Sequence, residues 1–199
     1  VEHYQLRDIG VNVRMRAVGR VQVLDIKSTD PYIEVVASEI RDKPMATTQR
    51  ADVRMAAAEV TRLHGECVRL RSVIVQACAG NEGCLDDAID IPEMVTWGHE
   101  LTDPESGFAR SLDAQVAEAA GQLSPGGAVL PWGCESQEDF ELQLRAFRAC
   151  ACFPPGARIE AMAMRSTAER MDKAVELLTE QVRVLAAKSA LAQLGWGTE

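Results

Sequence analysis

The stretch TAERMDKAVELLTEQVRVLAAKSALAQL, residues 167–194, has the longest uninterrupted periodicity in this chain of 199 residues. Its apolar and small residues recur at alternating spacings of four and three, which places them on one side of an α-helix: Met171, Val175, Leu178, Val182, Leu185, Ser189 and Ala192. A second apolar row makes that side wider than a coiled-coil seam: Leu177, Val184, Leu191 and Leu194. The stretch therefore predicts a long helix that packs against its own domain.

The ends of this helix are marked by residues that commonly begin and end helices. Thr167 is the expected N-cap, with Glu169 in the first turn, and Gly195 is the expected C-terminal stop. At 1.5 Å per residue the helix would span about 42 Å. The second apolar row supplies candidates for partner contact: Leu177, Val184 and Leu191.

Composition limits the class of protein. Hydrophobic residues make up 47% of the chain and charged residues 26%, which is typical of a globular protein and argues against disorder. A net charge of −9 argues against a nucleic-acid partner, because phosphate binding needs a basic surface. No run approaches the roughly 18 apolar residues of a transmembrane helix. A soluble chain is expected, with membrane association at most peripheral.

The N-terminal part shows strand patterns. Residues 11–17 alternate between apolar and polar, and a second strand begins at Val21 but changes phase at Leu24. That change predicts either a bulge or a strand buried on both faces. A third strand is expected over 32–40. Short connections then predict an antiparallel meander, whose open face would be covered by strands preceding Val1 or by another subunit.

Beyond residue 44 the spacing becomes helical. His64 falls on the apolar side of the first of these helices, so a buried core histidine is expected there. The fold class predicted is α+β, predominantly α-helical, ending in the long C-terminal helix. Its domains are a β portion at 1–45 and a helical extension at 46–199, with a turn-rich insertion at 81–135. The further helices are expected over 51–79, 108–123, 136–152 and 157–164.

Six cysteines and three tryptophans are the remaining candidates for function. Cys78 and Cys84 flank a Gly-rich turn and would suit a redox pair, although buried free thiols are the default interpretation. The tryptophans fall in expected loops or at a helix end, where an exposed indole often anchors an interface. Their positions are Trp97, Trp132 and Trp196. No metal or cofactor site is expected.

Two stretches resemble a known family. GVNVRMRAVGRVQVLDIKSTDPYIEVVASEIRDKP, residues 10–44, resembles the closing strands of the LON domain, the PUA-like N-terminal module of Lon proteases. The features in common are Val18, Gly19, Val21, Val23, Pro31, Tyr32 and the acidic Asp42. The C-terminal stretch looks like the helical close of stand-alone LON-domain proteins of plant and algal chloroplasts. The matching residues are Thr167, Ala168, Arg170, Ala187, Ser189 and Ala190.

This resemblance implies a function without catalysis. The chain has no G-x-x-x-x-G-K-[ST] motif, so the ATPase of a full Lon protease is not encoded, and no protease motif stands out. The expected function is a protein-interaction module in a chloroplast, serving as a subunit or an assembly factor of a larger complex, such as a photosynthetic one. Two alternatives stay open: a PUA-like RNA-binding protein, and a thiol-based redox sensor that uses Cys78 and Cys84.

Overall fold

The computed structural model describes residues 3–6, 10–14, 19–77, 111–123, 130, 134–150, 153 and 155–194. The chain divides into two compact units, Val1–Arg41 and Asp42–Glu199. The first unit holds the described strands and the second holds the described helices. The division therefore falls close to residue 45, where the β portion was expected to end.

The described strands form two antiparallel hairpins. Strand β1 (His3–Leu6) pairs with β2 (Val11–Arg14), and β3 (Arg20–Ser28) pairs with β4 (Glu34–Ile40). Antiparallel pairing is confirmed, but these strands make two separate sheets of two strands, not one three-stranded meander. Strand β1 was not predicted, because four residues are too few for an alternating pattern to stand out.

Strand β3 is irregular at the place where the sequence changes phase. Its pairing register with β4 shifts around Leu24 and again around Lys27, each of which is an extra residue relative to β4. The bulge predicted at Leu24 is therefore confirmed. The alternative of a strand buried on both faces is wrong, because the residues from Val21 to Lys27 are exposed.

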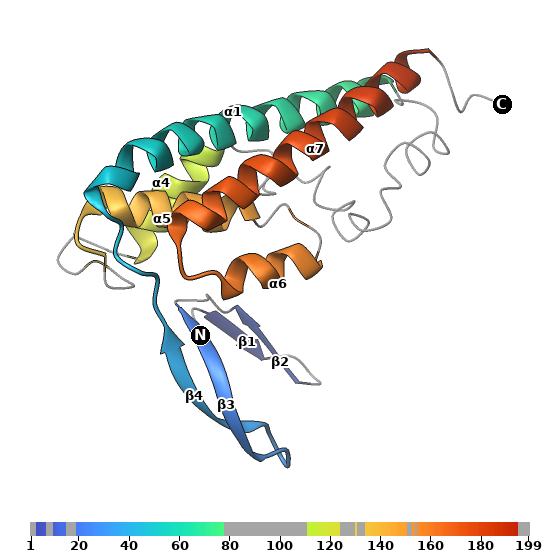
Figure 1. Ribbon diagram of the computed structural model, residues 1–199. Helices are drawn as coiled ribbons and strands as arrows, with labels where there is room; N and C mark the ends of the chain where they lie inside the picture. Colours follow the sequence, from blue (N-terminus) through green and yellow to red (C-terminus); the bar gives the residue numbers. More distant parts are fainter. Residues whose placement is uncertain are drawn as a thin grey trace. The chain divides into compact units, whose positions relative to one another are not determined.

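The helical unit is built around two long helices. Helices α1 and α7 have 31 and 27 residues, about 46 and 40 Å at 1.5 Å per residue, and they lie side by side in the same direction (Figure 1). Helix α5 packs against both of them, α4 packs mainly against α5, and α6 also packs against α5. The described helices are α1 (Thr47–Ala77), α4 (Leu112–Leu123), α5 (Gln137–Cys150), α6 (Pro155–Ala163) and α7 (Thr167–Gln193).

The core follows the predicted apolar rows. On α7 the buried residues include Met171, Leu178, Leu185 and Ser189, all members of the row read from the sequence. On α1 the buried row includes His64, only 2% exposed, so the expected core histidine is confirmed. The fold is α+β and predominantly helical, as the sequence predicts. In the described part of the chain, no helix is both long enough and apolar enough to cross a membrane.

One helix end differs from the prediction. The N-cap of α7 is Ser166, whose side chain accepts a hydrogen bond from the backbone N–H of Glu169, and Thr167 is already the first helical residue. Thr167 is buried and its hydroxyl is used elsewhere, which is why the cap moves back by one residue. The N-cap of α5 is Ser136, whose hydroxyl accepts from the backbone N–H of Asp139 at 3.1 Å.

Candidate functional site

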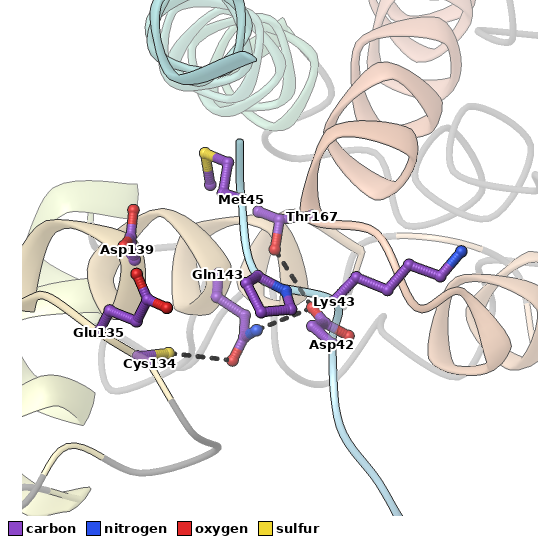
Figure 2. Close-up of a pocket in the computed structure, with 9 residues that line it drawn as sticks. Asp42, Lys43, Met45, Cys134, Glu135, Asp139, Gln143 and Thr167 are labelled. Carbon is purple, nitrogen blue, oxygen red and sulfur yellow. Dashed lines mark hydrogen bonds between the residues drawn. The ribbon is translucent and has the colours of Figure 1, made fainter. Parts of the chain in front are cut away.

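A small pocket opens at the start of the helical unit, where the chain arrives from β4 (Figure 2). Its volume is about 30 Å³, which is room for one or two water molecules and too little for an organic cofactor. Its walls come from the segment before α1, the start of α5 with the residues before it, and the first residue of α7. The lining residues are Asp42, Lys43, Pro44, Met45, Cys134, Glu135, Asp139, Gln143 and Thr167.

The carboxylate of Asp42 extends from this pocket into a buried ion pair with Arg170. Nη1 of Arg170 donates to Oδ2 of Asp42 at 2.8 Å, and Nη2 donates to Oδ1 at 3.0 Å. This parallel geometry suits a guanidinium and a carboxylate. The Arg170 side chain is 0% exposed and the Asp42 side chain 2%. Charges buried this deeply persist only when they are paired and hydrogen-bonded, so the pair is integral to the fold.

Two more N–H groups of Arg170 are directed at the end of α6. Nε donates to the backbone carbonyl of Ala161 at 3.0 Å, and Nη2 donates to that of Met164 at 2.6 Å. The last carbonyls of a helix have no partner within the helix, so Arg170 supplies one. Its guanidinium carbon also lies 3.9 Å from the ring centroid of Phe147 on α5. One side chain of α7 thus joins the segment before α1 to α5 and α6.

Asp42 has further partners on α5 and α7. Its Oδ2 accepts from the Gln143 amide at 2.9 Å and from the Thr167 hydroxyl at 3.2 Å. The backbone N–H of the next residue, Lys43, donates to the carbonyl of Arg165 at 2.8 Å. Figure 2 shows Gln143 between Cys134 and Asp42, while the Lys43 ammonium points away from the pocket. These contacts fix the segment before α1 against the start of α7.

A second set of ion pairs joins α1 to α5. Arg50 donates to Oδ2 of Asp139 at 3.0 Å, and Arg54 binds both carboxylate oxygens of Glu138. The hydrogen bond from Arg54 holds the pKa of Glu138 below its usual value. Nε of Arg50 and Oδ1 of Asp139 are buried without a hydrogen-bond partner. Both atoms belong to side chains that already pair with each other through Nη2 and Oδ2.

The pocket does not assemble reactive chemistry from its described residues. The Cys134 thiol donates to the Gln143 carbonyl oxygen at 3.6 Å. Burial raises the pKa of Cys134 to about 11, with the carboxylates of Asp139 and Asp42 adding to the effect. A thiol that stays protonated at neutral pH is a poor nucleophile. Within the described ranges, no three His, Cys, Asp or Glu side chains are grouped to hold a metal. The pocket is best described as part of a structural polar cluster.

The β3–β4 hairpin carries a different kind of candidate site, an exposed apolar face. Residues directly opposite each other in an antiparallel pair lie on the same face. Because Leu24 is extra, Val21, Val23 and Ile26 all fall on the face that holds Val35, Ala37 and Glu39 of β4. Three of these side chains are strongly exposed, at 60% for Val21, 52% for Val23 and 57% for Ile26. We call the five apolar residues, Val21, Val23, Ile26, Val35 and Ala37, the apolar face, and Glu39 lies beside them, opposite Val21.

The other side of the hairpin is mainly polar. Gln22 and Asp25 of β3 lie there opposite Ser38 and Val36 of β4. The bulge at Leu24 therefore determines which residues share a face. Strict alternation from Val21 would have put Ile26 with Gln22, and the extra residue returns it to the side of Val23.

The candidate residues chosen from the sequence are only partly covered by the structure. Trp97, Trp132 and Trp196 lie outside the described residues, as do Cys78 and Cys84. The three candidates on α7 are described. Leu177 is half-buried and packs against the core, Val184 is half-buried, and Leu191 is 41% exposed. The structure therefore brings none of the tryptophans or the redox cysteines into a described site.

The described cysteines behave as buried thiols. Cys67 and Cys150 are buried and Cys134 is half-buried, and all three are free. Burial raises the pKa of Cys67 to about 11 and that of Cys150 to about 12. The default interpretation of free, buried thiols is confirmed for Cys67 and Cys150.

Sequence reasoning missed the pairing of Asp42 with Arg170. Both residues were noted as features of the LON resemblance, but nothing in their local pattern indicates that they meet across 128 positions. A weak signal exists, because Arg170 falls one position before Met171 on the buried side of its helix. A charge on that side requires a partner.

Comparison with known protein families, curated proteins and solved structures gave no match.

Proposed function

We propose that this chain is a non-catalytic protein-interaction module that binds its partner through the apolar face of the β3–β4 hairpin. The observation that carries the proposal is the grouping of Val21, Val23 and Ile26 on one exposed face. Scattered apolar residues are normal on a surface, but a contiguous group on one face is typical of an interaction site.

The energetics favour a covered hairpin. A two-stranded hairpin is at best marginally stable in water, and a third strand or a packed layer makes it stable. Burying one Val or Ile side chain contributes about 1.5–3 kcal/mol relative to leaving it exposed. Several such side chains on the apolar face therefore give a partner protein a substantial driving force. The polar side, with Gln22 and Asp25, would remain in water.

The resemblance to LON-domain proteins adds support from a second direction. Its two stretches are far apart in the sequence, yet residues from both meet in the fold. Asp42 from the first stretch accepts hydrogen bonds from Thr167 and Arg170 of the second. Such a contact gives a physical reason for an acid after the last strand and an arginine in the first turn of the final helix. The proposal that the partner complex lies in a chloroplast rests on the resemblance alone.

The experiment compares two lysine variants at neighbouring positions of β3. Val23→Lys places a charge on the apolar face, and Gln22→Lys places the same charge on the polar side. Each tagged protein is purified from its own cells under mild detergent, and the accompanying proteins are quantified by mass spectrometry. We expect partners at near-equal stoichiometry with the wild type and with Gln22→Lys, and their loss with Val23→Lys.

The outcomes separate the classes of function. A fixed set of partners indicates a subunit of one assembly, and many sub-stoichiometric partners indicate an assembly factor. If both variants keep every partner, the apolar face is not the binding surface. If the wild type brings no partner at all, the interaction-module proposal fails. Circular dichroism of both variants checks that the lysines leave the fold intact.

A further inference from the structure

Helix α6 is attached to the helical unit with little apolar burial. Ala161 is fully buried and Ala157 is half-buried against the core, whereas Ile159 and Met162 are 70% and 52% exposed. The helix has nine residues, and isolated helices of that length are not stable in water. Its stability must therefore come from contacts with the rest of the unit.

Two hydrogen bonds from Arg170 contribute to that attachment. Nε and Nη2 of Arg170 bind the carbonyls of Ala161 and Met164, at the end of α6 and just beyond it. Arg170 would stay paired with Asp42 if α6 moved away, so opening α6 does not leave a buried charge alone. The ring of Phe147 would also continue to support the guanidinium.

We infer that residues 155–165 form a strap that opens as one local unit. The hydrogen bonds from Arg170 keep the strap closed, and Asp42 holds Arg170 in position. The strap belongs to the helical unit and the apolar face to the other unit, so this inference goes beyond the proposed function. Local openings of this kind occur in segments with few buried apolar contacts. Helices α1 and α7 share a long apolar core, so they stay closed while the strap opens.

The experiment is hydrogen exchange of the full chain, read by mass spectrometry. In the wild type, amides within 155–165 should exchange well before those in the middle of α1 and α7. In Asp42→Asn the carboxylate charge that orients Arg170 is lost. Exchange in the strap should then rise about ten- to a hundredfold, the effect of weakening a charge-assisted hydrogen bond. The middle of α1 exchanges only by global unfolding, which this variant also makes easier, so the strap should still exchange well before α1.

Asp113→Asn is the matched control. Asp113 also pairs with an arginine, Arg145, but its side chain is 63% exposed. This variant should leave exchange in the strap within about twofold of the wild type, because exposed ion pairs contribute little. Limited trypsin digestion is a second measurement, because Arg158 lies within α6 and Arg165 follows it. Cleavage at these sites should be faster in Asp42→Asn than in Asp113→Asn.

Two results would overturn the inference. One is exchange of 155–165 in step with the middle of α1 in the wild type, which would mean that α6 opens only by global unfolding. The other is exchange of 155–165 in Asp42→Asn at the wild-type rate. If that variant does not fold, Arg170→Lys replaces it. The ammonium keeps the charge but loses the planar fork that reaches both carbonyls and the carboxylate. If the strap exchanges at the wild-type rate in Arg170→Lys, the inference is likewise overturned.

Discussion

Asp42 and Arg170 lie 128 positions apart in the sequence and form two parallel hydrogen bonds, at 2.8 and 3.0 Å, with both side chains almost completely buried. Asp42 is the first residue of the helical unit, two positions after β4 ends at Ile40. The ion pair therefore fixes the place where the chain joins the helices. Four parts of the helical unit meet at this ion pair. They are the segment before α1, helix α5, the end of α6 and the start of α7.

Removing Asp42 should destabilise the protein strongly. Asp42→Ala leaves the buried guanidinium of Arg170 without its counter-charge, and such a loss costs about 3–5 kcal/mol. Urea unfolding followed by circular dichroism measures the change. The control is Asp113→Ala at an exposed ion pair, which should stay within about 1 kcal/mol of the wild type.

A double-mutant cycle separates the ion pair from other effects at these positions. Arg170→Met removes the charge while keeping an apolar stem, so Asp42→Ala combined with Arg170→Met should cost clearly less than the sum of the two single changes. Additive costs would show that the two side chains stabilise the fold independently. That result would contradict the central role of their ion pair.

How far the sequence predicts the fold depends on the range of the interactions. The spacing of Met171, Leu178 and Leu185 predicts the buried side of α7, because helical periodicity is local. The bulge at Leu24 is also a local feature, visible as a change of phase in one strand. Strand β1 was missed because four residues carry too little pattern.

The site could not be predicted in the same way. The partner of Arg170 is on a distant segment, and sequence periodicity says nothing about which distant residues meet. The prediction for Thr167 failed for a related reason. Thr167 and Ser166 are both good N-cap residues by type, and the choice between them depends on Asp42, which takes the hydroxyl of Thr167. The long-range contact decides the local cap.

The corrected cap gives a second prediction. Ser166→Ala removes the acceptor for the backbone N–H of Glu169 and should cost about 0.5–2 kcal/mol. Thr167→Val keeps the shape but removes the hydroxyl that donates to Asp42, and should cost about 1–3 kcal/mol because a buried acceptor loses a partner. Thermal unfolding measures both. Ser166→Ala as stable as the wild type would place the cap elsewhere.

His64 predicts a dependence of stability on pH. Burial, with a contribution from the charge of Arg71, holds the pKa of His64 below its ordinary value of 6.5. The unfolded chain therefore binds a proton at His64 more readily than the folded chain. Stability from this group is complete above about pH 6.5 and is lost as the pH falls, by at most about 1.4 kcal/mol per pH unit. Unfolding free energies between pH 5 and 7 should show this slope.

The control for that slope is His64→Leu. The variant changes the absolute stability, but its curve between pH 5 and 7 should be flatter than that of the wild type. Glu59, Glu66 and Glu138 have pKa values held below 4.5 by arginine partners, so their contributions are lost at lower pH. Equal slopes in the two proteins would show that His64 does not titrate differently on folding.

Thiol labelling gives a fourth prediction. Cys67 and Cys134 have pKa values raised from 9.0 to about 11, so at pH 8 their thiolate fraction falls about a hundredfold. Both should react with iodoacetamide far more slowly in the native protein than in urea, as measured by peptide mass spectrometry. The same labelling, carried out on reduced and on oxidised protein, tests the alternative of a redox sensor. If Cys78 and Cys84 are labelled to the same extent in both, that alternative is removed.

The boundary at Asp42 gives a fifth prediction, about which residues the helical unit needs. Residues 42–199 contain the whole polar cluster around Arg170, so this fragment should fold with cooperative unfolding and a helical circular-dichroism spectrum. Residues 44–199 lack both Asp42 and the backbone bond from Lys43 to Arg165. That fragment should be less stable by about 3–5 kcal/mol, because Arg170 is then buried without a counter-charge. Adding Arg170→Met to both fragments should reduce the difference between them. If the two fragments are equally stable without that substitution, the helices do not depend on Asp42, and the ion pair serves only to hold the segment that precedes α1.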